Sequence, residues 1–170
     1  MNQAQLVAPL SGWALPLSEV PDPVFSQGLA GQGWAIDPTE GVLVAPCDGE
    51  ITLIHRCKHA MTLRHPEGVE ILMHVGIDTV KLEGAGLQPQ VSVGQQVKAG
   101  QVLMKFDCDL LASQASSLVT VILVPEHPKL QAVQASGGMH KRGEPWMNLS
   151  LRQEGAGECD QSPVSLNSGQ

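Results

Sequence analysis

Short apolar runs, each closed by turn-forming residues, recur along the chain and predict β-strands. The runs are rich in Val, Ile and Leu, and glycine or proline stands at most of their ends. A helical spacing occurs over residues 109–118, where Leu110, Leu111 and Ala115 share a face and Asp109 is a candidate N-cap. We therefore expect an all-β, antiparallel barrel or sandwich with a single short helix. The strands are expected over residues 50–55, 60–64, 69–74, 101–106, 118–125 and 146–151.

A six-residue motif occurs twice in the first third of the chain. Residues 7–12 (VAPLSG) are matched by residues 44–49 (VAPCDG), and an alternating apolar run follows each copy. Proline ends the pairing of one strand, and the Ser-Gly or Asp-Gly pair supplies the turn into the next. The repeat therefore predicts two related β-corner units.

The composition favours one domain and excludes some classes of partner. The chain has 170 residues, enough for one hydrophobic core, and only 3% of them are aromatic, so aliphatic side chains must fill that core. A net charge of -7 leaves no basic surface for nucleic acid or anionic lipid. No apolar stretch reaches the length of a membrane span and no secretion signal is evident, so we expect a cytoplasmic protein.

The composition changes near the C-terminal end of the sequence. Residues 1–152 carry the strand pattern and are expected to form the domain. From residue 153 onward the chain is dominated by Gly, Ser, Gln and other small or polar residues, which bury too little apolar surface to offset the entropy of ordering. We expect residues 153–170 to be a flexible tail, or a linker to a further domain. The four cysteines show no CxxC spacing and are expected to be reduced thiols.

Two of the six histidines stand out by their position. His65, His127 and His140 adjoin predicted turns or charged residues and are expected to lie in solvated loops. His74, by contrast, ends an apolar run, and His59 directly precedes another one. Histidines at the ends of neighbouring strands are candidates for chemistry near neutral pH.

The predicted strand that ends at His74 places this residue on the more exposed face of a sheet. Because side chains alternate along a strand, His74 shares its face with Leu72 and Glu70. Gly76 allows the backbone to bend closely around the imidazole, and Asp78 follows two residues later. Gly76 and Asp78 are therefore candidate site residues beside His74.

A hairpin is expected to bring His59 close to His74. The strands 60–64 and 69–74 are joined by residues 65–68, and counting outward from this turn places the two histidines opposite each other. Two adjacent imidazoles can transfer a phosphoryl group, bind a divalent metal, or act as general acid and base. No P-loop, nucleotide fingerprint or magnesium-binding carboxylate cluster occurs, so a nucleotide bound by this chain is not expected as phosphoryl donor.

Four stretches of the sequence form a specific pattern: 68–84 (GVEILMHVGIDTVKLEG), 21–25 (PDPVF), 58–61 (KHAM) and 94–100 (GQQVKAG). With these stretches the chain resembles the glucose-type enzyme IIA family of the bacterial sugar phosphotransferase system. The resemblance implies a barrel-sandwich of the duplicated hybrid motif type, and it covers roughly residues 6–150. It implies that His74 is phosphorylated on its far ring nitrogen and that His59 donates a hydrogen bond to the phosphoryl group.

The resemblance also implies a docking face around the two histidines. The donor would be the histidine-containing phosphocarrier protein, and the acceptor a cysteine of a sugar-specific enzyme IIB of glucose or N-acetylglucosamine type. Val24, Phe25 and Leu72 would form an apolar ring, and Asp22 and Asp78 would meet arginines of the donor. Further phosphotransferase domains fused after residue 170 are compatible with this resemblance.

Three positions next to His59 depart from the family pattern. Cys57 stands where the family usually has a threonine whose hydroxyl orients the supporting histidine, and a thiol is a weak donor. His55 and Arg56 replace an aromatic and an acidic residue. No cofactor is required by the resemblance, although a zinc ion shared with a partner through His59 and His74 belongs to the family's properties.

Two other classes of function remain open from the residues alone. A zinc-dependent hydrolase could use His59, His74 and Asp78, because the last two form an HxxxD pattern, but a further HxH pair is missing. A swinging-arm carrier domain is suggested by residues 93–103, yet no lysine occupies a suitable hairpin tip. The sequence does not indicate which sugar is transported.

Overall fold

Most of the regular structure in this protein is β-strand. The computed structural model describes residues 2–152. All six predicted strands are present, and their ends differ from the prediction by at most two residues. The strands are β1 (Asn2–Val7), β2 (Gly12–Pro16), β3 (Gln32–Pro38), β4 (Val42–Val44), β5 (Gly49–Ile54), β6 (Ala60–Arg64), β7 (Glu70–His74), β8 (Leu87–Pro89), β9 (Gln96–Val97), β10 (Val102–Phe106), β11 (Thr120–Val124), β12 (Leu130–Ala135), β13 (Gly138–His140) and β14 (Pro145–Leu151).

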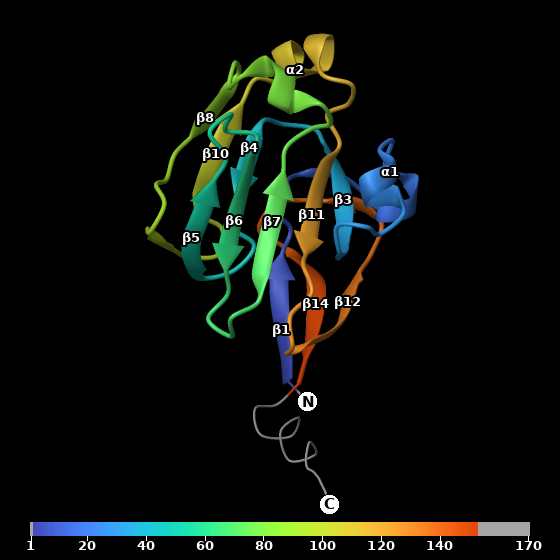
Figure 1. Cartoon of the computed structure of the whole chain (residues 1–170), viewed down its shortest axis with the longest axis vertical. Helices are drawn as coiled ribbons and strands as arrows, with labels where there is room; N and C mark the ends of the chain where they lie inside the picture. The colour runs from blue at the N-terminus through green and yellow to red at the C-terminus, as the bar shows by residue number, and fades with distance from the viewer. Residues whose placement is uncertain (1, 153–170) are drawn as a thin grey trace, which may run out of the picture.

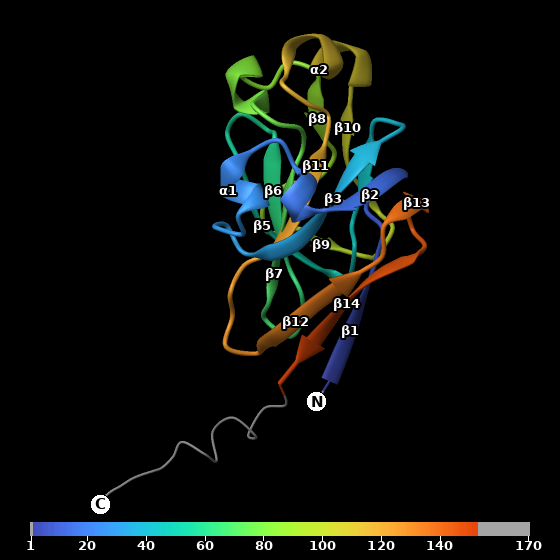
Figure 2. The same cartoon turned by 90° about the vertical axis from the view of Figure 1, so that its right-hand side faces the viewer.

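The strands pair into three sheets, and every pairing is antiparallel (Figure 1). The largest sheet has the order β13-β2-β3-β11-β7-β6-β5-β9, and two three-stranded sheets have the orders β1-β14-β12 and β4-β10-β8. The 90° view in Figure 2 shows β8 and β10 near α2 at the top of the molecule, and β1, β12 and β14 at the bottom. One aliphatic core contains side chains from all three sheets, including Leu6, Leu43 and Met73. The predicted all-β antiparallel class is confirmed.

A second, smaller core lies on the other face of the large sheet, beneath the helix α1 (Pro23–Ser26). This core contains Phe25, Ala35, Val121 and Leu123, and Leu72 packs against its edge. The face that carries His74 is therefore partly covered by the segment around α1 (Figure 2).

The helical structure differs from the prediction of a single helix. The predicted helix is present as α2 (Cys108–Gln114), but its N-cap is Asp107, whose Oδ1 accepts from Leu110 N at 3.1 Å, rather than Asp109. The additional helix α1 has only four residues, too few for apolar periodicity to reveal. Its signal is the Asp-Pro pair, since Asp22 is the N-cap and proline follows at the first position. Two 3-10 helices, η1 (Leu17–Glu19) and η2 (Thr79–Leu82), were not predicted.

The repeated motif forms two interlocked corners, as the sequence predicts. Each copy connects the end of one strand to the start of the next, from β1 to β2 and from β4 to β5. The two copies bond each other reciprocally, because Val7 N donates to Pro46 O and Val44 N donates to Pro9 O, both at 2.8 Å. The corners are thus related by an approximate two-fold arrangement.

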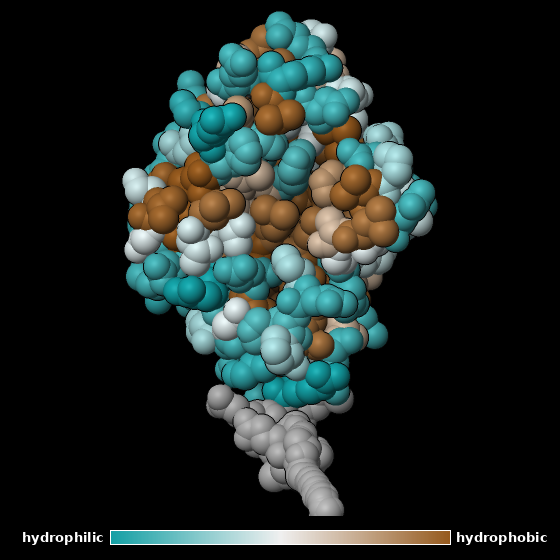
Figure 3. Space-filling view, in the orientation of Figure 1, coloured by the Kyte–Doolittle hydropathy of each residue, from teal (hydrophilic) through white to brown (hydrophobic). Residues whose placement is uncertain are grey.

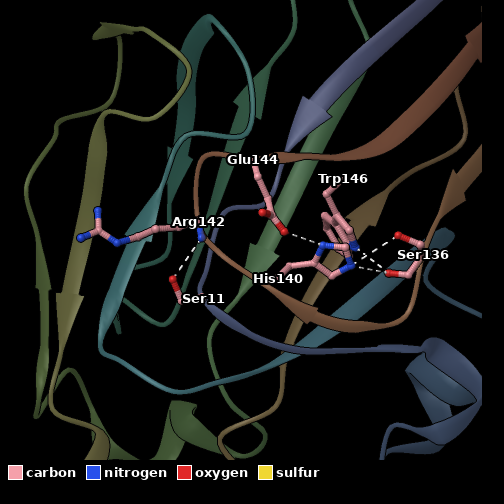
Figure 4. Close-up of polar contacts among 6 residues, drawn as sticks. All are labelled: Ser11, Ser136, His140, Arg142, Glu144 and Trp146. Carbon is pink, nitrogen blue, oxygen red and sulfur yellow. Dashed lines mark hydrogen bonds and ion pairs between the residues drawn. The ribbon is translucent and has the colours of Figure 1, made fainter.

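Each corner is also bonded by a distant loop, at the equivalent position of the repeat. Ser11 Oγ accepts from Arg142 N at 3.0 Å (Figure 4), and Asp48 Oδ1 accepts from Ala99 N at 2.8 Å. The first of these bonds joins the two ends of the described domain, and the second joins two segments in its middle. The matched bonds make the corners a structural feature rather than a chance similarity of six residues.

His140, which was expected in a solvated loop, is instead the last residue of β13 and forms part of this framework (Figure 4). Its side chain is only 12% exposed. Nδ1 lies 3.0 Å from a carboxylate oxygen of Glu144, and Nε2 lies 3.0 Å from Ser136 O. Trp146 Nε1 donates to the same carbonyl at 3.0 Å. Both ring nitrogens of His140 are therefore bonded, which gives it a structural role.

Two further predictions concern the end of the domain and the absence of a membrane span. The predicted boundary after residue 152 and the tail 153–170 lie outside the described residues. In the part of the chain that is described, no helix combines the length and the apolar character needed to cross a bilayer.

Candidate functional site

The burial pattern along β7 places His74 as the sequence predicts. Ile71 and Met73 are fully buried, whereas Glu70, Leu72 and His74 are half-buried on the opposite face. The neighbouring strand β11 pairs with β7 on one side and β6 pairs with it on the other. A rigid three-stranded unit therefore fixes the backbone of His74 at the end of its strand.

The hairpin register differs by one residue from the prediction. Ala60, not His59, is the residue paired with His74. The turn contains three residues between the paired His65 and Val69, with His65 N donating to Val69 O at 2.8 Å, whereas the prediction counted four. The two rings are nevertheless neighbours, since their centroids are 4.8 Å apart at an interplanar angle of 79°. The predicted adjacency of the imidazoles is therefore confirmed.

A tight turn before β6 accounts for the position of the His59 ring. In a continued regular strand, His59 would point to the face opposite Ala60 and thus opposite His74. The strand does not continue, because Lys58 adopts a left-handed conformation with φ 68°. His55 N donates to Ala60 O at 2.8 Å and closes the turn, while Val75 N donates to His59 O at 2.7 Å. These bonds set His59 beside the end of β7.

A hydrogen bond to Gly76 assigns the tautomer of His74. Nδ1 of His74 lies 2.9 Å from Gly76 O, and because a carbonyl oxygen can only accept, Nδ1 carries the proton. In the neutral ring the lone pair then belongs to Nε2, which makes Nε2 the nucleophilic atom. Gly76 has φ 74°, and a Cβ there would lie 2.6 Å from Thr79 Cγ2, so only glycine fits this bend.

Thr79 is a site residue that the sequence analysis missed. It is fully buried, and its Oγ1 donates to Val75 O at 2.6 Å. This bond closes the bend from β7 into η2 and so supports the Gly76 carbonyl that holds His74. The only sequence signal would have been a threonine four residues after Val75, the buried residue that follows the strand.

Both histidines are shifted toward the neutral form. Burial lowers the pKa of His74, and the hydrogen bond to Gly76 O and the charge of Asp22 oppose this effect. Burial lowers the pKa of His59 to about 4, and the like charges that His74 and His55 would carry when protonated add to the effect. Near pH 7 both rings are therefore neutral, as a nucleophile and an adjacent hydrogen-bond donor require.

His59 is more enclosed than the sequence analysis expected. Its exposed fraction is 5%, so it lies within the site wall, while His74 remains the more accessible ring. Nδ1 of His59 is buried without a hydrogen-bond partner, which means that the thiol of Cys57 does not bond it. Cys57 itself donates its backbone N–H to His55 Nδ1 at 3.0 Å. The structure therefore agrees with the prediction that residue 57 supplies no strong donor to orient the His59 ring.

The two predicted acidic residues occupy different environments. Asp22 caps α1, with Oδ1 accepting from Val24 N at 2.9 Å, and it is close enough to affect the pKa of His74. Asp78 is exposed and left-handed, with φ 64°, and its carboxylate accepts a short hydrogen bond from the hydroxyl of Ser116. Asp22 therefore belongs to the electrostatic surroundings of His74, and Asp78 is fixed at the rim by a residue the sequence analysis did not identify.

The residues of the predicted apolar ring form a buried wall, made by Phe25, and a more exposed rim, made by Val24 and Leu72. Phe25 was expected on the docking surface, but it is only 8% exposed, because it belongs to the smaller core. Its ring lies edge-on to His74, with centroids 5.4 Å apart. Val24 is 50% exposed and Leu72 half-buried. Leu53 was missed; it is also 50% exposed, and its register through Thr62 places it on the same sheet face as Leu72. Figure 3 shows apolar side chains gathered over β5 and over α1 on this face.

Zinc chemistry finds no support at this site. Within residues 2–152 no group of three or more His, Cys, Asp or Glu side chains is placed to hold a metal ion. Asp78, the third ligand in the hydrolase alternative, is engaged with Ser116 instead. The structure therefore does not support the zinc hydrolase alternative.

The low pKa of His59 predicts an acid-sensitive fold. A histidine whose pKa is depressed in the folded state binds fewer protons than in the unfolded chain, so its contribution to stability is present above the unfolded value and is lost as pH falls. With a shift from 6.5 to about 4, we expect the free energy of unfolding to decrease across this interval. The expected loss is up to about 3 kcal/mol. Urea unfolding at a series of pH values would measure it, and His59→Gln should flatten the slope.

A comparison with known proteins connects this geometry to a family. Residues 4–130 match the family described as phosphoenolpyruvate-dependent sugar phosphotransferase system, EIIA 1. The glucose-specific EIIA component of Bacillus cereus is 45% identical over 138 residues, which are 81% of this chain and 84% of that protein.

A larger protein and a solved structure are similar as well. The mannose-specific EIIBCA component of Corynebacterium glutamicum is 46% identical over 129 residues, 76% of this chain but 19% of that protein. The solved glucose permease IIA from Mycoplasma capricolum has a TM-score of 0.81 and 31% identity, covering 87% of this chain and 96% of that one. The family match, the similar sequences and the similar structure all belong to EIIA components or domains of the phosphotransferase system.

Proposed function

Since this chain belongs to the EIIA 1 family of the phosphoenolpyruvate-dependent sugar phosphotransferase system, in which it is a phosphoryl carrier, we propose that it carries the phosphoryl group on Nε2 of His74. The observation that supports this most is the hydrogen bond from His74 Nδ1 to Gly76 O, which leaves a lone pair on Nε2. The ring is the more accessible of the central pair, and its depressed pKa keeps it neutral. A nucleophilic nitrogen is thus ready without a separate general base.

The proposed reaction consists of two displacements at phosphorus. In the first, the Nε2 lone pair of His74 forms a bond to phosphorus while the P–N bond to the donor's phosphohistidine breaks, and its electron pair returns to the donor ring. In the second, a cysteine thiolate of the acceptor forms an S–P bond while the N–P bond to His74 breaks. No proton transfer is needed in either step, because His74 keeps its Nδ1 proton on Gly76 O throughout.

His59 is proposed to stabilise the phosphoryl group during both displacements. Its ring is adjacent to that of His74, with 4.8 Å between centroids. Because the charge of the transferred group is spread over three oxygens, a positioned N–H donor in a partly dry site lowers the barrier. Asp22, Val24, Leu72 and Asp78 are proposed to contact partners at the rim.

The proposed partners are the histidine-containing phosphocarrier protein as donor and an enzyme IIB as acceptor. The family supports both roles, and the Corynebacterium glutamicum relative carries an EIIBCA combination in one chain. Glucose is the sugar named for the Bacillus cereus relative, and mannose for the Corynebacterium glutamicum one. We propose that the partner determines the sugar, and that the reaction takes place in the cytoplasm. The two histidines alone offer too few ligands for us to assign zinc a part in it.

Labelling with radioactive phosphoenolpyruvate in the presence of the general phosphotransferase proteins tests the proposal. We expect one phosphoryl group per chain, stable to alkali and labile to acid, as a phosphohistidine is. Peptide mapping should place the label within residues 70–80. A chelator should leave the labelling unchanged. A chain that stays unlabelled, or a label on another histidine, would contradict the assignment.

A further inference from the structure

The supporting histidine has no hydrogen bond to fix its ring. Among the buried side-chain nitrogen and oxygen atoms of residues 2–152, His59 Nδ1 is the one without a partner. A buried N–H group without an acceptor is less well tolerated than an unpaired lone pair, so the ring proton is expected on Nε2. The donor function of His59 thus depends on its orientation, although no polar contact at Nδ1 enforces it.

Ring packing takes the place of that missing bond. The centroid of His55 lies 4.4 Å from that of His59 at an interplanar angle of 63°, and the centroid of His74 lies 4.8 Å from it at 79°. His59 is thus in edge-type contact with two rings and is 5% exposed. Rotation of its ring would require one of these neighbours to move.

His55 is itself held firmly by the turn before β6. Its Nδ1 accepts from Cys57 N at 3.0 Å, and its backbone N–H donates to Ala60 O at 2.8 Å. Because Nδ1 accepts a backbone N–H, the bonded ring has no free nitrogen lone pair to serve as a nucleophile. His55 therefore offers a fixed ring against which His59 can pack, and it has no nitrogen that could act as a nucleophile.

We propose that His55 is a positioning residue for phosphoryl transfer, which keeps the His59 ring in the orientation that presents Nε2–H to a phosphoryl group on His74. This inference rests on the proposed function of His59 and His74. It assigns a role to a residue that the sequence analysis recorded only as a departure from the family pattern. It also explains how the site works with Cys57 in place of a hydroxyl-bearing residue.

The central experiment compares two substitutions of the packing ring. His55→Ala removes the ring contact, and we expect phosphoryl transfer from His74 to a purified enzyme IIB domain to slow about tenfold. His55→Phe keeps an aromatic ring without nitrogen atoms and should remain within about twofold of the native rate. His65→Ala is the matched control, because His65 Nδ1 also accepts a backbone N–H two residues on, at 3.0 Å from Glu67, but lies in another turn.

A spectroscopic measurement distinguishes positioning from a general loss of structure. Nitrogen-15 NMR of the imidazoles reports the tautomer of each histidine, and we expect His59 to hold its proton on Nε2 in the native chain and in His55→Phe. His55→Ala should give a mixture of tautomers at His59 while the signals of His140 stay unchanged. Adding Cys57→Thr to His55→Ala supplies a hydroxyl near Nδ1 and should restore much of the rate and the single tautomer.

The outcomes separate this inference from the proposed function. Native transfer rates and an unchanged His59 tautomer in His55→Ala would overturn the positioning role, and so would equal slowing by His65→Ala. If instead the native chain is not labelled on His74, the proposed function fails, whereas the tautomer measurement still reports whether His55 orients His59.

Discussion

Replacing His74 by alanine is expected to reduce phosphoryl uptake by at least about a thousandfold. The imidazole provides the only atom in our scheme that bonds to phosphorus, and no other described histidine combines its accessibility with a free Nε2 lone pair. His59 cannot take over, because it is buried, with an exposed fraction of 5%. Uptake would be followed with labelled phosphoenolpyruvate and the two general phosphotransferase proteins.

The controls for this variant test whether the site or the whole domain is affected. His74 lies at the end of β7 and is half-buried, so its removal should leave the cores intact. His127→Ala is a suitable comparison, since His127 Nδ1 accepts from Lys129 N at 3.1 Å in a loop away from the described site. It should be labelled normally. Labelling of His74→Ala at more than a few per cent of the native rate would assign the phosphoryl group to a different residue.

His59→Ala is expected to leave phosphoryl uptake within several-fold of native and to slow delivery to enzyme IIB about a hundredfold. The difference follows from the charge of the two nucleophiles. In uptake the attacking ring is neutral, whereas in delivery an anionic thiolate approaches the negatively charged phosphoryl oxygens. The N–H donor of His59 offsets that repulsion, so its loss should affect delivery more.

Single-turnover chase of the labelled variant with an acceptor domain would measure this effect. His59→Gln provides the informative comparison, because a glutamine amide can place an N–H donor near the position of Nε2, and we expect it to recover part of the delivery rate. Equal slowing of uptake and delivery in His59→Ala would contradict the larger effect that we expect on delivery. It would instead indicate that the alanine void disturbs His74.

The sequence pattern was sufficient for the parts of the site that depend on period-two alternation. Ile71 and Met73 are buried and Leu72 and His74 lie opposite, because one face of β7 must pack on the main core. The paired corners were also evident from the sequence, since the same turn chemistry occurs at equivalent positions. Strand alternation and turn preferences depend on residues that are neighbours in sequence, so they can be predicted without knowing the long-range contacts.

The features that were missed depend on turns and on distant contacts. The register error came from one residue of loop length, and the placement of His59 beside His74 depends on the left-handed Lys58 rather than on strand pairing. Phe25 was assigned to the surface because the four-residue helix that buries it was not recognised. The bond from Ser116 to Asp78 joins residues far apart in the chain, which no local pattern can indicate.

The interlocked corners have a consequence for biosynthesis. The corner at residues 7–12 is completed by a bond from Arg142, and the corner at residues 44–49 by a bond from Ala99. The N-terminal corner is synthesised first, so it can form its bond only after nearly all of the described domain has been made. Contacts of such long sequence separation must close large loops before they gain any stability. We therefore expect a nascent chain that ends before β14 to remain open to proteases, with rapid acquisition of the native state only after that strand has emerged.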